Sequence, residues 1–465
     1  MKIHKIVAHK IVIVRKDIIM KDKKTLIYII IIIVLILILG ILWYLIIKGN
    51  TNNNSVNNNT PGMNNNSSIA YSAVKEITTD ENITDEEYKS TNADENAVLL
   101  SGNITSTLSG ITIQKTGDSD GGDNTSFYGT NSAVLAKSGA NVTIQNATIT
   151  TDATGANGVF SYGGSATTSN SSSDGTTVNI SDSKITTTKD NSGGIMTTGG
   201  GIMNATNLTV LTSGTSSAAI RSDRGGGTVN VDKGTYKTTG KGSPAVYSTA
   251  DITVKNATLT SLASEGLIIE GKNKITIENV QLTDTNNTLN GQSTTYKNIF
   301  IYQSMSGDAD AGTAEFSSKD STIVTNKGDS IYVTNTKASI ILENNEFINN
   351  DSSGNFLRIQ KDSWGASGSN GGDVDLVLTN QKVNGNIVVD SISKLSMKLS
   401  KISSYEGTIN NSNEAKEMKL ILDSTSTIKL TGDSYISELE DEDTTYSNID
   451  LNGYKLYVGG KEFTK

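Results

Sequence analysis

Histidine and cysteine, the side chains most often used for acid–base and nucleophilic catalysis near neutral pH, are almost missing from this sequence of 465 residues. It has no cysteine, and its two histidines, His4 and His9, precede an apolar stretch that begins at Leu26. Disulfides, thiol catalysis, cysteine metal sites and a lipidated cysteine are therefore excluded. The long part of the chain after the apolar stretch offers no histidine as a general acid or base.

Two arginines around an aspartate are the best catalytic candidates. Arg221, Asp223 and Arg224 lie in the stretch AAIRSDRGGG, at the end of an expected strand. The competing interpretation is a solvated corner of the fold in which these charges pair locally. Arg358, in LRIQK, is interpreted as an outward-facing residue of another strand.

Three aspartates resemble the start of a calcium-binding loop. Asp118, Asp120 and Asp123 occur in GDSDGGDN. The twelfth position from Asp118 is Gly129, whereas an EF-hand needs a bidentate glutamate there. A solvated turn is the alternative. We therefore expect no cofactor, with calcium binding as a possibility.

Aromatic residues in loops are the candidates for ligand binding. The larger insertions in the repeat described below are 117–131, 162–176, 286–297 and 361–373. Three of them carry candidates: Phe127 and Tyr128, Tyr162, and Trp364. Aromatic faces can stack on sugar rings, and loops on a rigid scaffold are common places for binding. The alternative is that each ring packs back on its own part of the scaffold.

A repeat with apolar residues at positions x, x+2 and x+7 must position these loops. It fits Val142/Ile144/Ile149, Val178/Ile180/Ile185, Met203/Ala205/Val210, Val229/Val231/Tyr236, Ile252/Val254/Leu259, Ile275/Ile277/Leu282, Ile340/Leu342/Phe347 and Leu376/Leu378/Val383. Alternation predicts a strand with one buried face, and the odd offset to x+7 predicts a turn before the next strand. A third strand is expected near x+17, at Val159, Ile195, Ile220, Val246, Ile269 and Leu357.

The residue at x+4 is asparagine or aspartate in every unit but one. These residues are Asn146, Asp182, Asn207, Asn256, Asn279, Asn344 and Asn380, with Lys233 as the exception. Asparagine and aspartate tolerate a left-handed backbone, and stacked asparagines can bond from coil to coil. Gly234, which follows Lys233, could supply the turn instead.

Three short strands and three corners per unit predict an all-β fold, a right-handed single-stranded parallel β-helix. A β-sandwich gives no reason for the fixed register, and a propeller needs longer blades and more aromatic residues. The segments ANVTIQNATITTD (140–152), ADITVKNATLTS (250–261) and the ending 426–461 resemble bacterial surface β-helix proteins of the pectin-lyase-like and adhesin-like kind. The resemblance implies a fold more than an activity, and relatives include carbohydrate-binding proteins, adhesins and polysaccharide lyases. A pectate-lyase-like mechanism would use an arginine base near calcium, for which Arg221 or Arg224 is the candidate.

Residues 26–47 are apolar and uncharged, long enough to cross a bilayer as a helix. Lysines and arginines before this segment predict a cytoplasmic N-terminus and an extracellular C-terminal part, anchored in the cell membrane by a single pass. A cleaved signal peptide is the alternative, although its apolar region should be shorter. The expected divisions are a basic segment at 1–25, the span at 26–47, an Asn-rich linker and possible cap at 48–97, and the β-helix at 98–465. Met20 is a second possible start.

The net charge of −9 and the scattered lysines argue against nucleic acid as a partner. We expect a cell-surface protein, more a binder than an enzyme, that recognises a polysaccharide or another cell surface through loops on a β-helical scaffold. The alternative is a polysaccharide lyase-like enzyme acting on acidic polysaccharide.

Overall fold

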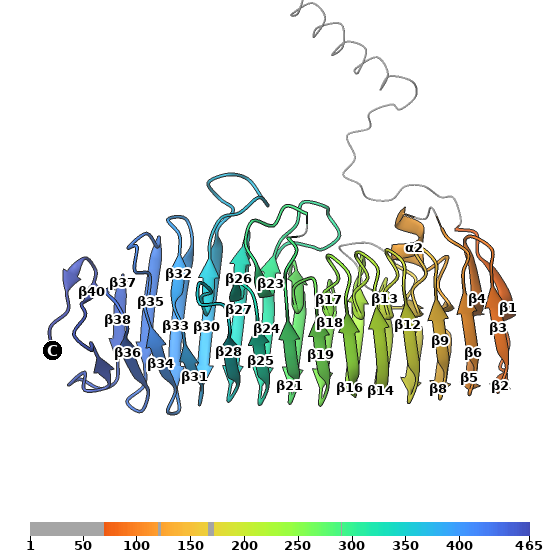
Figure 1. Ribbon diagram of the computed structural model, residues 1–465, viewed down its shortest axis with the longest axis horizontal. Coiled ribbons are helices and arrows are strands. Elements are labelled where there is room, and N and C mark those ends of the chain that lie inside the picture. The colour runs from red at the N-terminus through yellow and green to blue at the C-terminus, as the bar shows by residue number, and fades with distance from the viewer. Residues whose placement is uncertain (1–68, 120–121, 166–171, 290) are drawn as a thin grey trace, which may run out of the picture. The chain divides into compact units, whose positions relative to one another are not determined.

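The computed structural model describes residues 69–119, 122–165, 172–289 and 291–465 (Figure 1). All belong to one compact unit that begins at Met63, and its strands stack coil on coil along one axis. Within these ranges α2 (Gly122–Tyr128) is the one α-helix. No helix of the described residues is long and apolar enough to cross a membrane. The predicted span at 26–47 and the basic segment before it lie outside the described residues.

The first of three strand columns forms a twelve-stranded parallel sheet, called here the first sheet. Its strands are β1 (Ser72–Ile77), β4 (Glu95–Ser101), β7 (Val134–Lys137), β10 (Val159–Tyr162), β13 (Ile195–Thr198), β15 (Ile220–Ser222), β17 (Val246–Ser248), β20 (Leu267–Glu270), β23 (Lys297–Tyr302), β26 (Asp329–Thr334), β29 (Leu357–Ile359) and β32 (Ile387–Val389). Each strand comes from a different coil. The strands expected near x+17 are among them.

The second column holds the strands at x and x+2. Its strands are β2 (Asn82–Thr84), β5 (Thr105–Ser109), β8 (Asn141–Gln145), β11 (Thr177–Ser181), β14 (Gly201–Thr212), β16 (Gly227–Thr238), β18 (Asp251–Lys255), β21 (Lys274–Glu278), β24 (Thr313–Lys319), β27 (Thr336–Glu343), β30 (Gly372–Thr379), β33 (Lys394–Ser400), β35 (Glu417–Leu422) and β38 (Glu438–Asp441). The long strands β14 and β16 run through the corner into the third column.

The third column holds the strands at x+7. Besides the second halves of β14 and β16, it has β3 (Glu87–Ser90), β6 (Thr112–Lys115), β9 (Thr148–Thr151), β12 (Lys184–Thr187), β19 (Thr258–Ser261), β22 (Gln281–Asp284), β25 (Thr322–Thr325), β28 (Glu346–Asn349), β31 (Lys382–Asn384), β34 (Ser404–Gly407), β36 (Thr427–Leu430) and β39 (Ile449–Asp450). At the C-terminal end β37 (Ser434–Ile436), β40 (Leu456–Val458) and β41 (Lys461–Glu462) form a small sheet, in which β40 and β41 pair antiparallel.

The predicted register holds between the coils. Val142 lies beside Val178, and Ile149 lies beside Ile185, all with side chains fully buried. Parallel pairing of strands from successive coils therefore confirms the parallel β-helix. In one unit the expected position near x+17 is shifted by two residues, because Leu267, not Ile269, is the partner of Val246.

Between the coils that begin at Val142 and Leu376, one coil escaped the sequence pattern. Phe316 and Ile323 occupy positions x and x+7 of a coil between those that begin at Ile275 and Ile340. Its x+2 residue is Ser318, whose hydroxyl donates a 2.6 Å hydrogen bond to the side chain of Asn345. The pattern missed this coil because a polar side chain with a buried partner stands where an apolar one was required.

The turns at x+4 have the predicted left-handed backbone. All eight residues have a positive φ, from 48° at Asp182 to 65° at Lys233. The prediction that Gly234 would replace Lys233 in this role was incomplete, because both residues have positive φ. Side chains bond along this corner, as from Asn207 to Asp182 at 2.7 Å and from Asn279 to Asn256 at 2.8 Å.

Strand pairing begins N-terminal to residue 98. Strand β1 pairs with β4, β2 with β5 and β3 with β6, so residues 72–90 supply a complete first coil. The apolar residues that face inward form one continuous core from Ile77 to Leu456.

Candidate functional site

The outer face of the first sheet carries large side chains in one row, called here the outer ladder. Strand register aligns Leu99, Leu135, Phe160, Met196, Arg221, Tyr247, Ile268, Phe300, Tyr332, Arg358 and Val388. Side chains alternate between the two faces of a strand, so a row beside inward-facing Val159 or Ile195 must point away from the core. An apolar outer row needs cover, and the loops at this edge of the coils supply it.

Two groups of the outer ladder are covered by different loops. Leu99, Leu135, Phe160 and Met196 form one cluster, against which Tyr71 and Tyr162 pack. Ile268, Phe300 and Tyr332 form a second cluster with Tyr247, Tyr302 and Trp364. Arg221 stands in the ladder between the two clusters.

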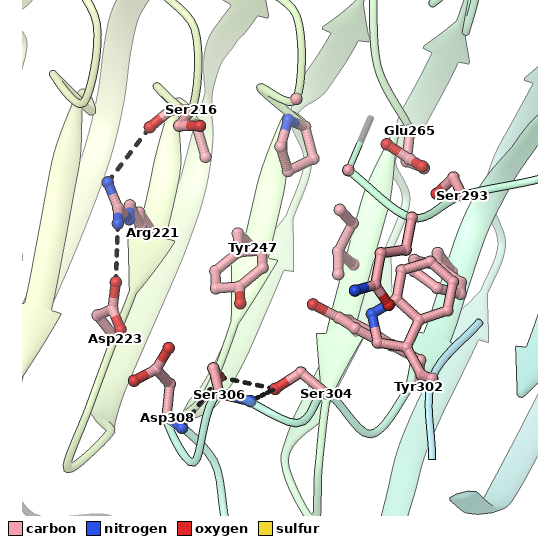
Figure 2. Close-up of a pocket in the computed structure, with 18 of the residues that line it drawn as sticks. Ser216, Arg221, Asp223, Tyr247, Glu265, Ser293, Tyr302, Ser304, Ser306 and Asp308 are labelled. Atoms are coloured by element: carbon pink, nitrogen blue, oxygen red, sulfur yellow. Dashed lines mark hydrogen bonds and ion pairs between the residues drawn. The ribbon is translucent and has the colours of Figure 1, made fainter. Parts of the chain in front are cut away.

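A cleft of about 610 Å³ opens over the second cluster and reaches Arg221 (Figure 2). Its wall residues include Arg221, Asp223, Pro244, Tyr247, Glu265, Ile268, Ser293, Phe300, Tyr302, Ser304, Asp308 and Trp364. In Figure 2 Arg221 and Asp223 lie at one side, Glu265 and Tyr302 at the other, and Tyr247 between them. The volume suits a small ligand or a few rings of a polymer.

The arginines at one end of the cleft are held by carboxylates. A nitrogen of Arg221 lies 2.7 Å from Oδ2 of Asp223, and another donates to the carbonyl of Ser216. The guanidinium of Arg224 lies 2.5 Å from Oδ1 of Asp308. It also lies over the ring of Phe127, 4.0 Å from its centre. Burial raises the pKa of Asp223, against the lowering effect of Arg221.

A buried carboxylate lies beside the same cleft. Glu270 accepts hydrogen bonds from the hydroxyls of Tyr247, Tyr302 and Ser304. Only 1% of Glu270 is exposed, and burial raises its pKa while these three donors lower it. The bonds fix the two tyrosine rings of the cleft.

An ion pair of Lys297 with Glu265 stands at the other end. Lys297 Nζ lies 3.6 Å from Oε1 of Glu265 and donates to the hydroxyl of Ser293 at 2.9 Å. The same ammonium lies 4.2 Å from the ring centre of Phe300 and 5.9 Å from that of Trp364. Burial lowers the pKa of Lys297, whereas Glu265 raises it.

The loop that carries Trp364 is fixed in place. Its indole packs on Phe300 and Tyr302, with ring centres 5.3 Å and 5.2 Å away. The amide of Asn370 donates to the carbonyl of Trp364 at 2.8 Å, and Tyr332 donates to Asp362 at 2.6 Å. These contacts hold the indole at the cleft without a ligand.

Three of the predicted site residues therefore meet at one place. Arg221, Asp223 and Trp364 line the cleft, and Arg224 contacts it through Asp308. The charges pair locally, as the alternative interpretation expected, but the corner is not solvated, because the Arg221 and Asp223 side chains are at most 12% exposed. Trp364 does pack on its scaffold, yet it also borders the cleft.

Of the other predicted aromatic residues, Tyr162 packs on the first cluster. Phe127 is 6% exposed and covered by Arg224, so its ring faces are not open to a ligand. Tyr128 and Tyr162 pack edge to face, with ring centres 5.6 Å apart. Tyr71 donates to the carbonyl of Tyr128 at 3.2 Å.

The predicted calcium ligands are only partly described. Asp118 accepts a 2.7 Å hydrogen bond from the backbone nitrogen of Thr154, and Asp123 lies in the first turn of α2. Asp120 lies outside the described residues. Among the residues that the structure describes, no group of three or more histidine, cysteine, aspartate or glutamate side chains could hold a metal ion.

Sequence reasoning missed Tyr247, Glu265, Glu270, Lys297 and Tyr302. A signal for the site was nevertheless present one residue after the predicted x+17 position. That residue is large and apolar or aromatic in several coils, as at Phe160, Met196 and Tyr247. An outward row of this kind implies a covered face.

Neither a protein-family model nor a curated protein matches this sequence. Among solved structures, "The cryo-EM structure of the Vag8-C1 inhibitor complex" contains a chain similar to this one. The two chains are 15% identical, with a TM-score of 0.40, and the alignment covers 80% of this chain and 100% of that one.

Proposed function

We propose that this chain is a cell-surface binding protein, held in the membrane by residues 26–47, whose cleft on the first sheet binds polysaccharide without cleaving it. The observation that carries the proposal is the aromatic wall of Tyr247, Phe300, Tyr302 and Trp364 beside hydrogen-bonding groups. Flat apolar faces with a few fixed polar groups suit sugar rings, which present C–H faces and hydroxyl edges.

Fixed geometry supports binding in this cleft. The tyrosine hydroxyls are tied to Glu270, and the tryptophan loop is tied by Asn370. A ligand would therefore meet rings that are already ordered, so that little conformational entropy is lost on binding.

Catalysis by an arginine base has weaker support. A lyase-like reaction would need Arg221 or Arg224 to lose a proton. Each guanidinium already contacts a carboxylate within 2.7 Å, so this carboxylate competes with a substrate for its nitrogens. The lyase alternative would regain support if acidic polysaccharides incubated with the protein yielded unsaturated products.

A glycan array with the full-length protein tests the proposal. Trp364→Ala should weaken the binding of any glycan that gives a signal at least about tenfold, since stacking on one aromatic side chain contributes roughly 1–3 kcal/mol. Tyr454→Ala is the matched control, because it removes a ring that is 43% exposed near the C-terminus and not part of the cleft. No bound glycan, or equal loss in both variants, would reject the cleft as a polysaccharide site and favour an adhesive surface without a sugar ligand.

A further inference from the structure

The charges around the cleft restrict which glycans it can take. Among the described residues that line it, Arg221 is the one cation, whereas Asp223, Glu265 and Asp308 are carboxylates. A polymer of uronic acids needs cations that can pair with its own carboxylates. Binding of such a polymer would therefore require a nearby cation without a carboxylate partner.

Each cation at the cleft already has a carboxylate partner. Arg221 contacts Asp223 at 2.7 Å, Arg224 contacts Asp308 at 2.5 Å, and Lys297 contacts Glu265 at 3.6 Å. Two of these pairs are costly to separate, since both side chains of the Lys297 pair are at most 3% exposed and those of the Arg221 pair at most 12%. Removing one partner would leave a buried charge alone.

The protonation of Glu270 then sets the net charge of the groups around the cleft. Three cations face three carboxylates in these pairs, and Glu270 is a fourth carboxylate with hydroxyl donors only. The local charge is therefore −1 when Glu270 is ionised and zero when it is protonated. In neither state does the cleft attract an anion.

We infer that the cleft takes glycans of neutral or amino-bearing sugars and discriminates against uronate glycans. The inference rests on the proposed polysaccharide binding and narrows its ligand class. A sugar carboxylate would lose water near at least three fixed carboxylates without gaining a cation. A protonated amino group of a sugar would instead lie near these carboxylates, which attract its positive charge.

The test uses three hexasaccharides with the same β-1,4 linkage and ring configuration. They are the hexamers of glucose, of glucosamine and of glucuronate. Calorimetric titration of the full-length protein should give the glucuronate hexamer an affinity at least about tenfold below that of the glucose hexamer, because uncompensated like charges cost on the order of 1 kcal/mol or more. The glucosamine hexamer should bind as tightly as the glucose hexamer or more tightly. Loss of binding in Trp364→Ala assigns the signal to the cleft.

The variant Asp308→Asn tests whether a carboxylate at the cleft disfavours glucuronate. It removes the carboxylate that contacts Arg224 at the edge of the cleft, where the Asp308 side chain is 24% exposed. The ratio of glucuronate to glucose affinity should rise about three- to tenfold. Asp310→Asn is the control, because Asp310 lies two residues further on, pairs with Lys272 at 3.0 Å and does not line the cleft.

The outcomes separate the two proposals. Glucuronate binding equal to or tighter than glucose binding, lost in Trp364→Ala, would overturn the charge inference and leave the polysaccharide site standing. An unchanged affinity ratio in Asp308→Asn would also overturn the charge inference. If no hexamer binds, and the three hexamers with galactose configuration do not bind either, polysaccharide binding itself fails, and the charge inference with it.

Discussion

Lys297 and Glu265 form an ion pair below the protein surface, with Nζ 3.6 Å from Oε1 and side chains 0% and 3% exposed. Lys297 begins strand β23, and Glu265 precedes strand β20 of the neighbouring coil. The pair links two coils at the cleft and places the ammonium against the ring of Phe300. Its stability depends on both partners being present.

Glu265→Gln should lower the free energy of unfolding by about 3 kcal/mol, since it leaves the Lys297 charge buried without its partner. The double variant Glu265→Leu/Lys297→Met should lose much less, because neither charge remains buried. Denaturant unfolding of the two variants measures both values. A double variant at least as unstable as Glu265→Gln would contradict this account of the pair.

Lys233→Asn should stabilise the protein by about 0.5–1 kcal/mol. Lys233 has φ 65°, whereas the same corner of other coils carries asparagine or aspartate. Asparagine tolerates this left-handed backbone better than lysine. Thermal unfolding is the measurement, and Lys237→Asn, which changes an outward residue of the same strand β16, is the control. Stabilisation by both variants, or by neither, would contradict the assignment to backbone conformation.

Phe316→Ala should destabilise the protein by about 3–5 kcal/mol, the usual cost of removing a buried phenylalanine. Phe316 is fully buried between Ile275 and Ile340 in a coil that the repeat pattern missed. Ile341→Ala, which truncates an apolar side chain that is 45% exposed on β27, is the control and should cost less than about 1 kcal/mol. Chemical unfolding measures both. A loss of unfolding free energy in Phe316→Ala as small as that in Ile341→Ala would mean that this coil contributes little to the core.

The coil architecture could be predicted because it depends on local periodicity. Inward residues such as Val142 and Ile149, and turn residues such as Asn256, recur at fixed offsets in eight coils. The coil at Phe316 was missed because the partner of Ser318, Asn345, is 27 residues away. Burial of a serine cannot be inferred until its distant acceptor is known.

The cleft was predictable only in part, for a similar reason. Arg221, Asp223 and Trp364 were singled out by residue type, but nothing local places Trp364 near Arg221. Their meeting depends on how many coils separate them and on loops that fold over the same face. Glu270 escaped notice because its three hydroxyl donors come from residues 23, 32 and 34 positions away.

Asp284→Asn should remove part of the pH dependence of stability. Burial raises the pKa of Asp284 to about 8, although hydrogen bonds from the backbone nitrogens of Asn286 and Asn326 lower it. A folded-state pKa above the unfolded value of 3.8 means that this group stabilises the fold fully below pH 3.8 and that the contribution is lost as pH rises through about 8. The wild-type protein should therefore lose stability relative to Asp284→Asn across this window, by no more than about 1.4 kcal/mol per pH unit.

Calorimetric melting at pH 5 and pH 8 checks the sign of this effect. The midpoint of Asp284→Asn minus that of the wild-type protein should be larger at pH 8 than at pH 5. Comparing the difference between two proteins at each pH cancels the titration of all other groups that they share. Asp375→Asn, at an exposed position of β30, is the control for the loss of one carboxylate. A difference for Asp284→Asn that stays constant or shrinks toward pH 8 would show that the buried carboxyl is not held protonated by its surroundings.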